Sequence, residues 1–160
     1  DDRLESARLN GASHTRVLSE GVTVSDIKSS WGIRPTVVFE VSGTQGGLAA
    51  AKEWLEPGGR LVMVGLQSSV GELDYRTLSL IEYEVIGTNA HVARTDFPRA
   101  LELLTGEGAW STIAPEVLPL SSVVSDGLEP LVSRTGTRIK TLFDPRISTA
   151  QPSEMSVSPA

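Results

Sequence analysis

The stretch PGGRLVMVGL, residues 57–66, is the starting point for predicting the fold. A Pro-Gly-Gly turn leads into an apolar run that ends at a further glycine, Gly65. A short continuous apolar run bounded by turn residues is typical of a strand buried in a parallel sheet. The closing glycine has two interpretations: a turn within a scaffold, or bare backbone that a ligand approaches closely. The stretch alone leaves both interpretations open.

Neighbouring segments extend this strand into a repeating pattern. TVVFEVSG (36–43) is a β-branched run, which predicts a strand buried on both faces. GGLAAAKEWLEPGG (46–59) carries apolar residues at helical spacing, and YEVIGTNA (83–90) is a third strand candidate. Strand, helix, strand, helix and strand in this order predict an α/β fold with a parallel sheet.

The rest of the chain adds helices, two short strands and a tail. The expected elements are a helix over 2–10 closed by Gly11, a strand over 15–20, an amphipathic segment over 22–35, a helix over 95–108 capped by Thr95 or Asp96, a short helix within 119–134 and a strand over 137–145. We expect one domain over residues 1–146. Residues 147–160 are rich in Ser and Pro and hold no aromatic residue, which predicts a disordered tail.

Composition excludes several classes of protein. The chain has 160 residues and a net charge of −6, without a basic stripe, so nucleic acid is not an expected partner. It has no cysteine, which excludes disulfides and thiolate metal sites within this chain. No apolar run is long enough to cross a bilayer. We therefore expect a cytoplasmic protein that binds no membrane.

The ordered set of motifs resembles the C-terminal nucleotide-binding domain of the medium-chain, mostly zinc-dependent, alcohol dehydrogenases. The matching segments are RLESARLNGA (3–12), VVFEVSG (37–43), LEPGGRLVMVGL (55–66), EYEVIGTNA (82–90), DFPRALELL (96–104) and RIKTLFDP (138–145). Each motif alone is common, and their order carries the resemblance. It implies a partial Rossmann-like, doubly wound parallel sheet.

The same resemblance implies that part of such a domain lies upstream of this chain. The family's phosphate loop, G-x-G-x-x-G, is absent from these 160 residues. Its zinc-binding catalytic domain would lie further upstream, so we expect an N-terminally truncated piece of a longer parent. The acidic residue that binds the ribose is also expected upstream, and Asp1 or Asp2 would serve only if the turn is unusually short. The choice between NAD and NADP therefore stays open.

By resemblance, nine residues contact the cofactor. Val41 and Ser42 would line its adenosine side, and Val64, Gly65 and Leu66 would meet the nicotinamide end. Thr88 and Ala90 would contact the carboxamide through the backbone. Arg3 would reach the adenosine ribose, and Lys140 would lie near the pyrophosphate. The plain alternatives are core residues for Val64 and Leu66, a turn for Gly65, a strand-end hydroxyl for Thr88 and solvated charges for Arg3 and Lys140.

No catalytic or metal-binding residue is expected in this chain. His14 and His91 are its two histidines, and neither has a second ligand at a metal-binding spacing. Glu40 lies within a predicted buried strand. The resemblance implies that this acidic position belongs to the fold or to the cofactor rim.

The resemblance implies the cofactor-binding part of an NAD(P)-dependent oxidoreductase that moves hydride between nicotinamide and an alcohol or carbonyl. Alone, the chain is expected to be inactive and to bind cofactor weakly or not at all. Two alternatives stay open. One is the same domain from a zinc-independent quinone or enoyl reductase. The other is a non-catalytic module that forms a homodimer through the edge strand EYEVIGTNA.

Overall fold

The computed structural model describes residues 2–18, 21–72, 74–106, 108, 110–133 and 135–153. The chain divides into two compact units. The central unit is Val17–His91, and the terminal unit consists of the segments before and after it. The single domain expected over residues 1–146 remains a prediction.

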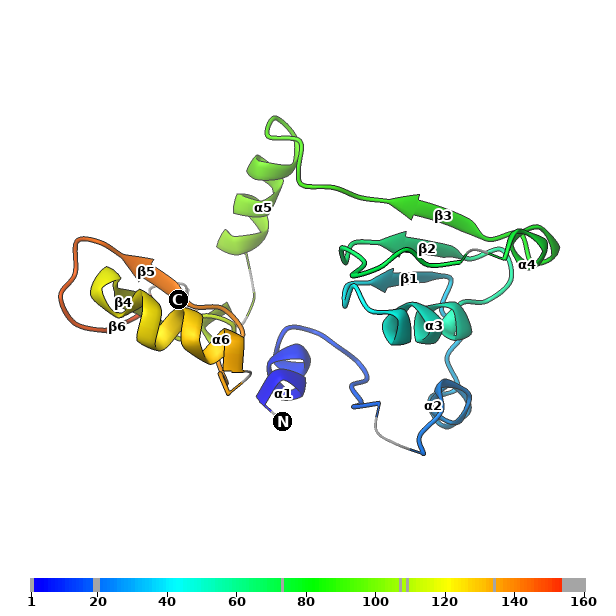
Figure 1. Ribbon diagram of the computed structural model, residues 1–160, viewed down its shortest axis with the longest axis horizontal. Helices are drawn as coiled ribbons and strands as arrows, with labels where there is room; N and C mark the ends of the chain where they lie inside the picture. The colour runs from blue at the N-terminus through cyan, green and yellow to red at the C-terminus, as the bar shows by residue number, and fades with distance from the viewer. Residues whose placement is uncertain are drawn as a thin grey trace. The chain divides into compact units, whose positions relative to one another are not determined.

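The central unit is built on a parallel sheet of three strands. β1 (Val37–Glu40), β2 (Arg60–Met63) and β3 (Glu84–Gly87) lie side by side in this order (Figure 1). Both pairs are parallel. The α/β class with a parallel sheet, predicted from the alternation of strands and helices, is confirmed.

Helix α3 (Gln45–Trp54) connects β1 to β2 and forms the core with them. It begins at Thr44, whose hydroxyl oxygen accepts a hydrogen bond from the Gly47 N–H at 3.0 Å. The buried core cluster consists of Ala51, Leu55 and Leu61, and Val38, Leu48, Met63 and Tyr83 pack against it. Burial of this apolar surface is what holds the helix on the sheet.

Helix α2 (Val24–Trp31) docks on α3 through its aromatic end. The rings of Trp31 and Trp54 stack with centroids 5.7 Å apart. Beside them, the Glu56 carboxylate accepts from Lys28 Nζ at 2.7 Å and from Arg34 Nη2 at 2.9 Å. The loop after β2 leads into the short helix α4 (Tyr75–Leu80), which precedes β3.

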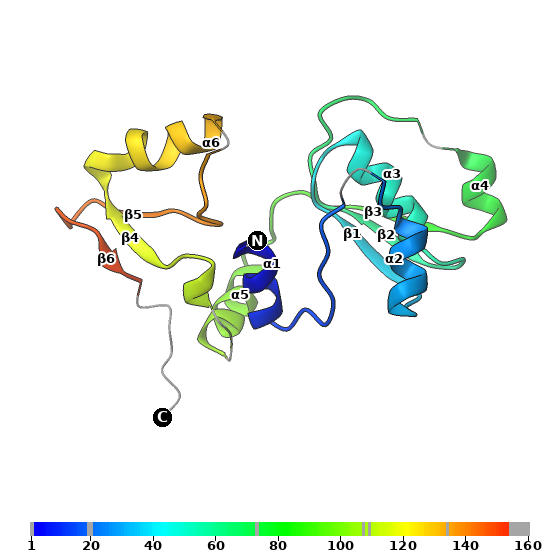
Figure 2. The same ribbon diagram turned by 90° about the horizontal axis from the view of Figure 1, so that it is seen from below.

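The terminal unit holds a second sheet in the order β5-β4-β6 (Figure 2). β4 pairs with β5 in parallel and with β6 in antiparallel. The elements of this unit are α1 (Asp2–Leu9), α5 (Asp96–Thr105), η1 (Trp110–Thr112), β4 (Glu116–Pro119), η2 (Leu120–Ser122), the π-helical η3 (Val123–Leu128), α6 (Glu129–Ser133), β5 (Leu142–Asp144) and β6 (Gln151–Pro152). A hydrogen bond between the hydroxyls of Ser6 and Thr112, 2.7 Å long, ties α1 to η1.

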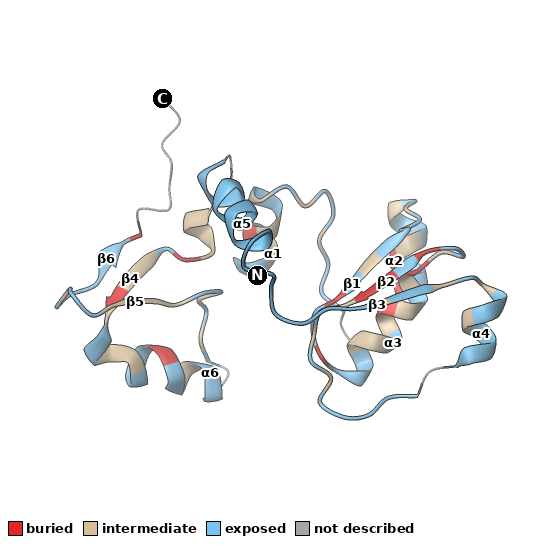
Figure 3. Cartoon of the chain, turned by 90° about the horizontal axis from the view of Figure 1, so that it is seen from above, coloured by how far each residue is buried: buried red, intermediate tan, exposed pale blue. Residues whose placement is uncertain are grey.

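Three strand predictions differ from the structure. The strand expected over 137–145 is confined to β5, because residues 137–141 form no strand. Residues 14–18 have no regular secondary structure, so the strand expected over 15–20 is wrong there, and residues 19 and 20 lie outside the described residues. β1 is not buried on both faces, since Phe39 is 63% exposed. The reason is that α3 covers one face of β1 only. Figure 3 shows the buried residues of the chain in red and the exposed ones in pale blue. β2 does follow the expected pattern, with Leu61 2% and Val62 8% exposed.

The tail expected to be disordered begins with ordered residues. Gln151 and Pro152 form β6 opposite Val117 and Glu116 of β4. Ser153 is buried, its N–H donates to the Pro115 carbonyl at 3.0 Å, and its hydroxyl donates to the Ala114 carbonyl. The expectation is therefore corrected for residues 147–153, and residues 154–160 lie outside the described residues. The reason is the open edge of β4, which offers backbone hydrogen-bond partners to Gln151 and Pro152 although these residues have little strand propensity of their own.

Deleting residues 147–160 is expected to destabilise the terminal unit by about 1–3 kcal/mol. β4 loses the strand β6 on one edge, and the residues just before β4, Ala114 and Pro115, lose the two hydrogen bonds from Ser153. Hydrogen exchange followed by mass spectrometry would then show faster exchange in peptides that cover β4. Deleting only residues 154–160 is the matched control and should leave β4 unchanged. Equal exchange of β4 in both truncated chains would contradict the role of β6.

Candidate functional site

The carboxyl ends of β1, β2 and β3 lie at one edge of the central sheet, because parallel strands end on the same side. Seven of the nine predicted cofactor residues follow these strands. We call this set the strand-end lip: Val41 and Ser42 after β1, Val64, Gly65 and Leu66 after β2, and Thr88 and Ala90 after β3. These seven residues therefore lie on one side of the central unit.

Glu40, the last residue of β1, holds the first segment of the lip through its side chain. Its carboxyl group is buried, with the residue 3% exposed. Oε1 accepts from the Ser42 N–H at 2.7 Å, the Ser42 hydroxyl at 2.5 Å and the Gly43 N–H at 3.1 Å. Oε2 accepts from Gln67 Nε2 at 2.7 Å. One carboxylate thus connects the segment after β1 with the segment after β2.

The backbone of Glu40 reinforces the same connection. Its carbonyl oxygen accepts from the N–H groups of Val64 at 2.9 Å and Gly65 at 2.8 Å. These two donors are directed into the protein. Any ligand at this edge therefore meets side chains and the remaining backbone groups of Val64 and Gly65.

Neutral hydrogen-bond donors stabilise the charge on Glu40. The Ser42 hydroxyl is the largest of the influences that lower the pKa of Glu40, and burial opposes it. The backbone N–H groups of Ser42 and Gly43 and the Gln67 amide lower it further. The carboxylate also lies against the first turn of α3, where the helix dipole favours negative charge: a Cβ at Gly47 would lie 2.9 Å from Oε1.

Gly65 is a glycine because two backbone segments meet there. A Cβ at Gly65 would lie 2.9 Å from Glu40 Oε2 and from Gly43 Cα, and closer still to Gly43 N. Gly43 in turn has φ 65°, and a Cβ on it would overlap the Leu66 carbonyl. The bare backbone at Gly65 is therefore required by the fold itself.

The third segment of the lip is fixed to β2. Both the N–H and the hydroxyl of Thr88 donate to the Met63 carbonyl, each at 3.1 Å. Ala90 has φ 53°, in the left-handed region that residues other than glycine seldom adopt. Its carbonyl and methyl directions are thus set by an unusual backbone conformation at an exposed position.

Apolar side chains of the lip are exposed. Val41 is 69%, Val64 49% and Leu66 95% exposed, so Val64 and Leu66 are not core residues. Exposed apolar side chains beside polar backbone suit a flat ligand with both apolar and hydrogen-bonding parts.

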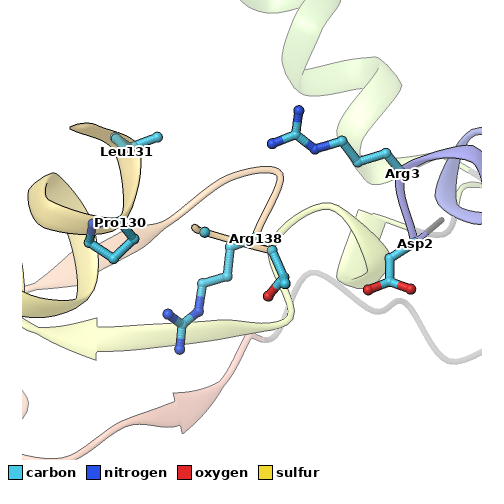
Figure 4. Close-up of a pocket in the computed structure, with 7 residues that line it drawn as sticks. Asp2, Arg3, Pro130, Leu131 and Arg138 are labelled. Carbon is cyan, nitrogen blue, oxygen red and sulfur yellow. The ribbon is translucent and has the colours of Figure 1, made fainter. Parts of the chain in front are cut away.

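Arg3 and Lys140 belong to the terminal unit, where they differ in setting. Arg3 lines a cavity of about 580 Å³ together with Asp2, Pro130, Leu131, Gly136, Thr137 and Arg138 (Figure 4). Lys140 does not line it; its N–H donates to the Ile113 carbonyl, and the residue is exposed. Asp1, the other acidic candidate, lies outside the described residues.

Arg138 is a cavity residue that the sequence reasoning missed. Its guanidinium pairs with Glu116 of β4, with Nε 2.9 Å from Oε1. Arg3 extends toward the cavity from α1 (Figure 4). The run Thr137-Arg138-Ile139-Lys140 holds two cations, and only the fold decides which one faces the cavity. The cavity thus has charges of both signs in its lining, Arg3 and Arg138 with Asp2.

The described residues do not form a site for zinc. Among the residues that the structure describes, no three His, Cys, Asp or Glu side chains gather as a metal site. The described part of the chain also contains no helix with the length and apolar character needed to cross a membrane.

Comparison with known proteins identifies relatives of this fold. Residues 1–106 match the family model described as zinc-binding dehydrogenase. Among curated protein sequences there is no match.

Solved structures of alcohol dehydrogenases share the fold. A 2R,3R-butanediol dehydrogenase from Bacillus subtilis is 23% identical with a TM-score of 0.74, and the match covers 91% of this chain and 41% of that one. An alcohol dehydrogenase of Escherichia coli CFT073, in complex with NADH, is 19% identical with a TM-score of 0.70, covering 88% and 41%. A thermostable alcohol dehydrogenase from Pyrobaculum aerophilum is 25% identical with a TM-score of 0.59, covering 88% and 40%. The chain thus spans about two fifths of the length of these relatives.

Gly65→Ala is expected to destabilise the central unit by about 2 kcal/mol or more, since the new methyl group overlaps the Gly43 backbone. Gly46→Ala is the matched control, because a Cβ there meets nothing within 4 Å. It should change stability by no more than about 1 kcal/mol, toward stabilisation. Urea unfolding of both variants measures the difference, and similar midpoints would contradict the proposed close approach.

The contribution of Glu40 to stability should depend on pH. Because the folded state holds the pKa of Glu40 below its ordinary value, the unfolded chain takes up the proton first as the pH falls. The contribution is complete above about pH 4.3 and is lost as the pH falls further. The difference in unfolding free energy between the natural chain and Glu40→Gln should therefore narrow below that pH. A difference that stays constant from pH 7 to pH 3 would show that the charge plays no part.

Proposed function

We propose that this chain, which belongs to the family of zinc-binding dehydrogenases, is the cofactor-binding part of an NAD(P)-dependent medium-chain alcohol or polyol dehydrogenase. The parent would transfer hydride between nicotinamide and an alcohol or carbonyl. The observation that carries the proposal is the strand-end lip, which lies at the carboxyl ends of adjacent parallel strands. Open α/β sheets bind dinucleotides at this edge.

The lip residues would divide the cofactor between them. Val64, Gly65 and Leu66 would face the nicotinamide end, with Thr88 and Ala90 beside its carboxamide. Val41 and Ser42 would line the adenosine side. When bound, the nicotinamide supplies the hydride exchange, and the protein residues orient its ring.

Two of the proposed cofactor residues, Arg3 and Lys140, belong to the terminal unit. We propose Arg3 for the ribose and Lys140 for the pyrophosphate. The cavity that Arg3 lines supports the first of these assignments only, because Lys140 does not line it. Asp2 lines the same cavity, which supports it as a hydroxyl-binding residue. Both NAD and NADP fit the proposal, and the NADH complex of the Escherichia coli relative supports NAD.

A catalytic zinc ion would be held by residues outside this chain. This chain would then contribute no metal ligand, general acid or base, and residues 1–146 would form part of the dinucleotide-binding domain. The setting we propose is cytoplasmic, without nucleic acid or membrane partners. A zinc-independent quinone or enoyl reductase is the second candidate within the same family. The segments EYEVIGTNA and DFPRALELL, which resemble the polyol and secondary-alcohol branch, favour the first.

A non-catalytic dimerisation module is a candidate of another class. β3 is an edge strand of the described sheet, and its free edge supports a homodimer in which two such strands pair. Size-exclusion chromatography separates the cases. A stable dimer without cofactor favours the module, and a marginally folded or aggregating chain favours the enzyme part.

The chain alone is expected to show no dehydrogenase activity with NAD or NADP and to bind either cofactor more weakly than micromolar. NMR titration with millimolar NADH should nevertheless shift the amide signals of Val64 to Leu66 and of Thr88 to Ala90 most strongly. Activity assays with secondary alcohols and polyols accompany the titration.

NADPH serves as the comparison ligand. The amide signal of Leu80, an exposed residue of α4 away from the strand ends, serves as the internal reference. Amide shifts confined to α4 and α5 at millimolar NADH would contradict the assigned site. A micromolar dissociation constant would contradict the expected weakness.

A further inference from the structure

We infer that Glu40 is a positioning residue for the proposed cofactor site and that Gln67 is its partner: their hydrogen bond locks the segments after β1 and β2 into one arrangement. The part of this inference that concerns the cofactor rests on the proposed function. Neither residue belongs to the strand-end lip itself, so both would act through the lip residues.

The bond between Glu40 and Gln67 is a side-chain link between the two segments. The other donors to the carboxylate, Ser42 and Gly43, follow Glu40 within its own segment. Gln67 comes from the segment after β2 and directly follows Leu66, with Nε2 2.7 Å from Oε2. Fixing Gln67 therefore fixes the position of the residue that precedes it.

The orientation of the Gln67 amide shows that the carboxylate dictates this contact. Nε2 is directed at Glu40, while Oε1 is buried and has no hydrogen-bond partner among the described residues. Reversing the amide would place its oxygen against a carboxylate oxygen, which is repulsive. The charge of the carboxylate therefore holds the amide donor of Gln67 on Glu40.

The role of Glu40 differs from that of an apolar core residue. The apolar core of the central unit is Ala51, Leu55 and Leu61, and Glu40 is not part of it. Burying a carboxylate opposes folding through desolvation, unless its hydrogen bonds compensate. What the carboxylate adds is direction: it turns the N–H groups of Ser42 and Gly43 inward and holds Gln67.

The role predicts a local effect in the 160-residue chain. Glu40→Gln and Gln67→Met should each accelerate hydrogen exchange of the amides of Gly43, Val64 and Gly65 by about tenfold or more, since a hydrogen bond to a charged acceptor is commonly worth that factor. Amides of Leu61 and Val62 within β2 should keep their rates. Exchange read residue by residue by NMR makes the comparison.

Glu56→Gln is the matched control. Glu56 also accepts two side-chain donors in the central unit, Lys28 and Arg34, but it does so at the contact of α2 with α3. This variant should leave the exchange at Gly43, Val64 and Gly65 unchanged. If Glu40→Gln accelerates exchange at Leu61 and Val62 as much as at the three amides named above, the inference is overturned, because Glu40 would then contribute to global stability. Unchanged lip amides in Gln67→Met would overturn it as well.

A cofactor measurement separates this inference from the proposed function. With millimolar NADH as the probe, Gln67→Met should weaken the amide shifts at Val64 and Leu66 by several fold relative to the unsubstituted chain, while Glu56→Gln keeps them. If the unsubstituted chain shows no shifts at all, the assigned contacts of Val64 and Leu66 with the cofactor fail, and the exchange data still decide whether Glu40 and Gln67 couple the two segments. Shifts of full size in Gln67→Met would overturn the positioning role.

Discussion

The buried carboxylate of Glu40 is the constraint on which the carboxyl edge of the central sheet depends. It stands at the end of β1, against the first turn of α3, and gathers hydrogen bonds from two segments that would otherwise be independent loops. A charge in this place is tolerable because four neutral donors and a helix N-terminus surround it. The same residue joins the strand ends through its backbone carbonyl. Side chain and main chain of one position thus act together, which is why the edge is ordered without a large apolar core beneath it.

The glycines of this edge follow from that arrangement. Once Glu40 draws both segments together, the backbone at Gly43 lies against the backbone at Gly65, and neither position has room for a side chain. A glycine at the end of a buried strand was open to two interpretations, scaffold or ligand approach. The structure supports scaffold for Gly65 itself, while its exposed neighbours Val64 and Leu66 remain the side chains that a ligand would meet. The two interpretations therefore apply to adjacent residues.

Periodicity in the sequence was sufficient for the central sheet, its connecting helix and the positions that follow each strand. Those features depend on local apolar patterns, which a sequence displays directly. It was insufficient for β1, whose outer face is exposed although its residues are β-branched, because burial depends on what else packs there. It also missed β6, since Gln151 and Pro152 have low strand propensity and pair only because the edge of β4 is available. In the site, Glu40 was recognised as a fold or rim position, but its link to Gln67 and the place of Arg138 depend on loop geometry that no spacing rule describes.

The pairing of β6 with β4 limits where a tag or a dye can be attached to this chain. The last described residue, Ser153, is buried and bonded to the backbone on either side of Pro115, so the chain is anchored up to that point. A reporter dye or purification tag joined directly after Ser153 would compete with that anchor for the same space. Attachment through a flexible spacer beyond residue 153, or at an exposed position of α5 such as Leu103, would leave the terminal sheet intact.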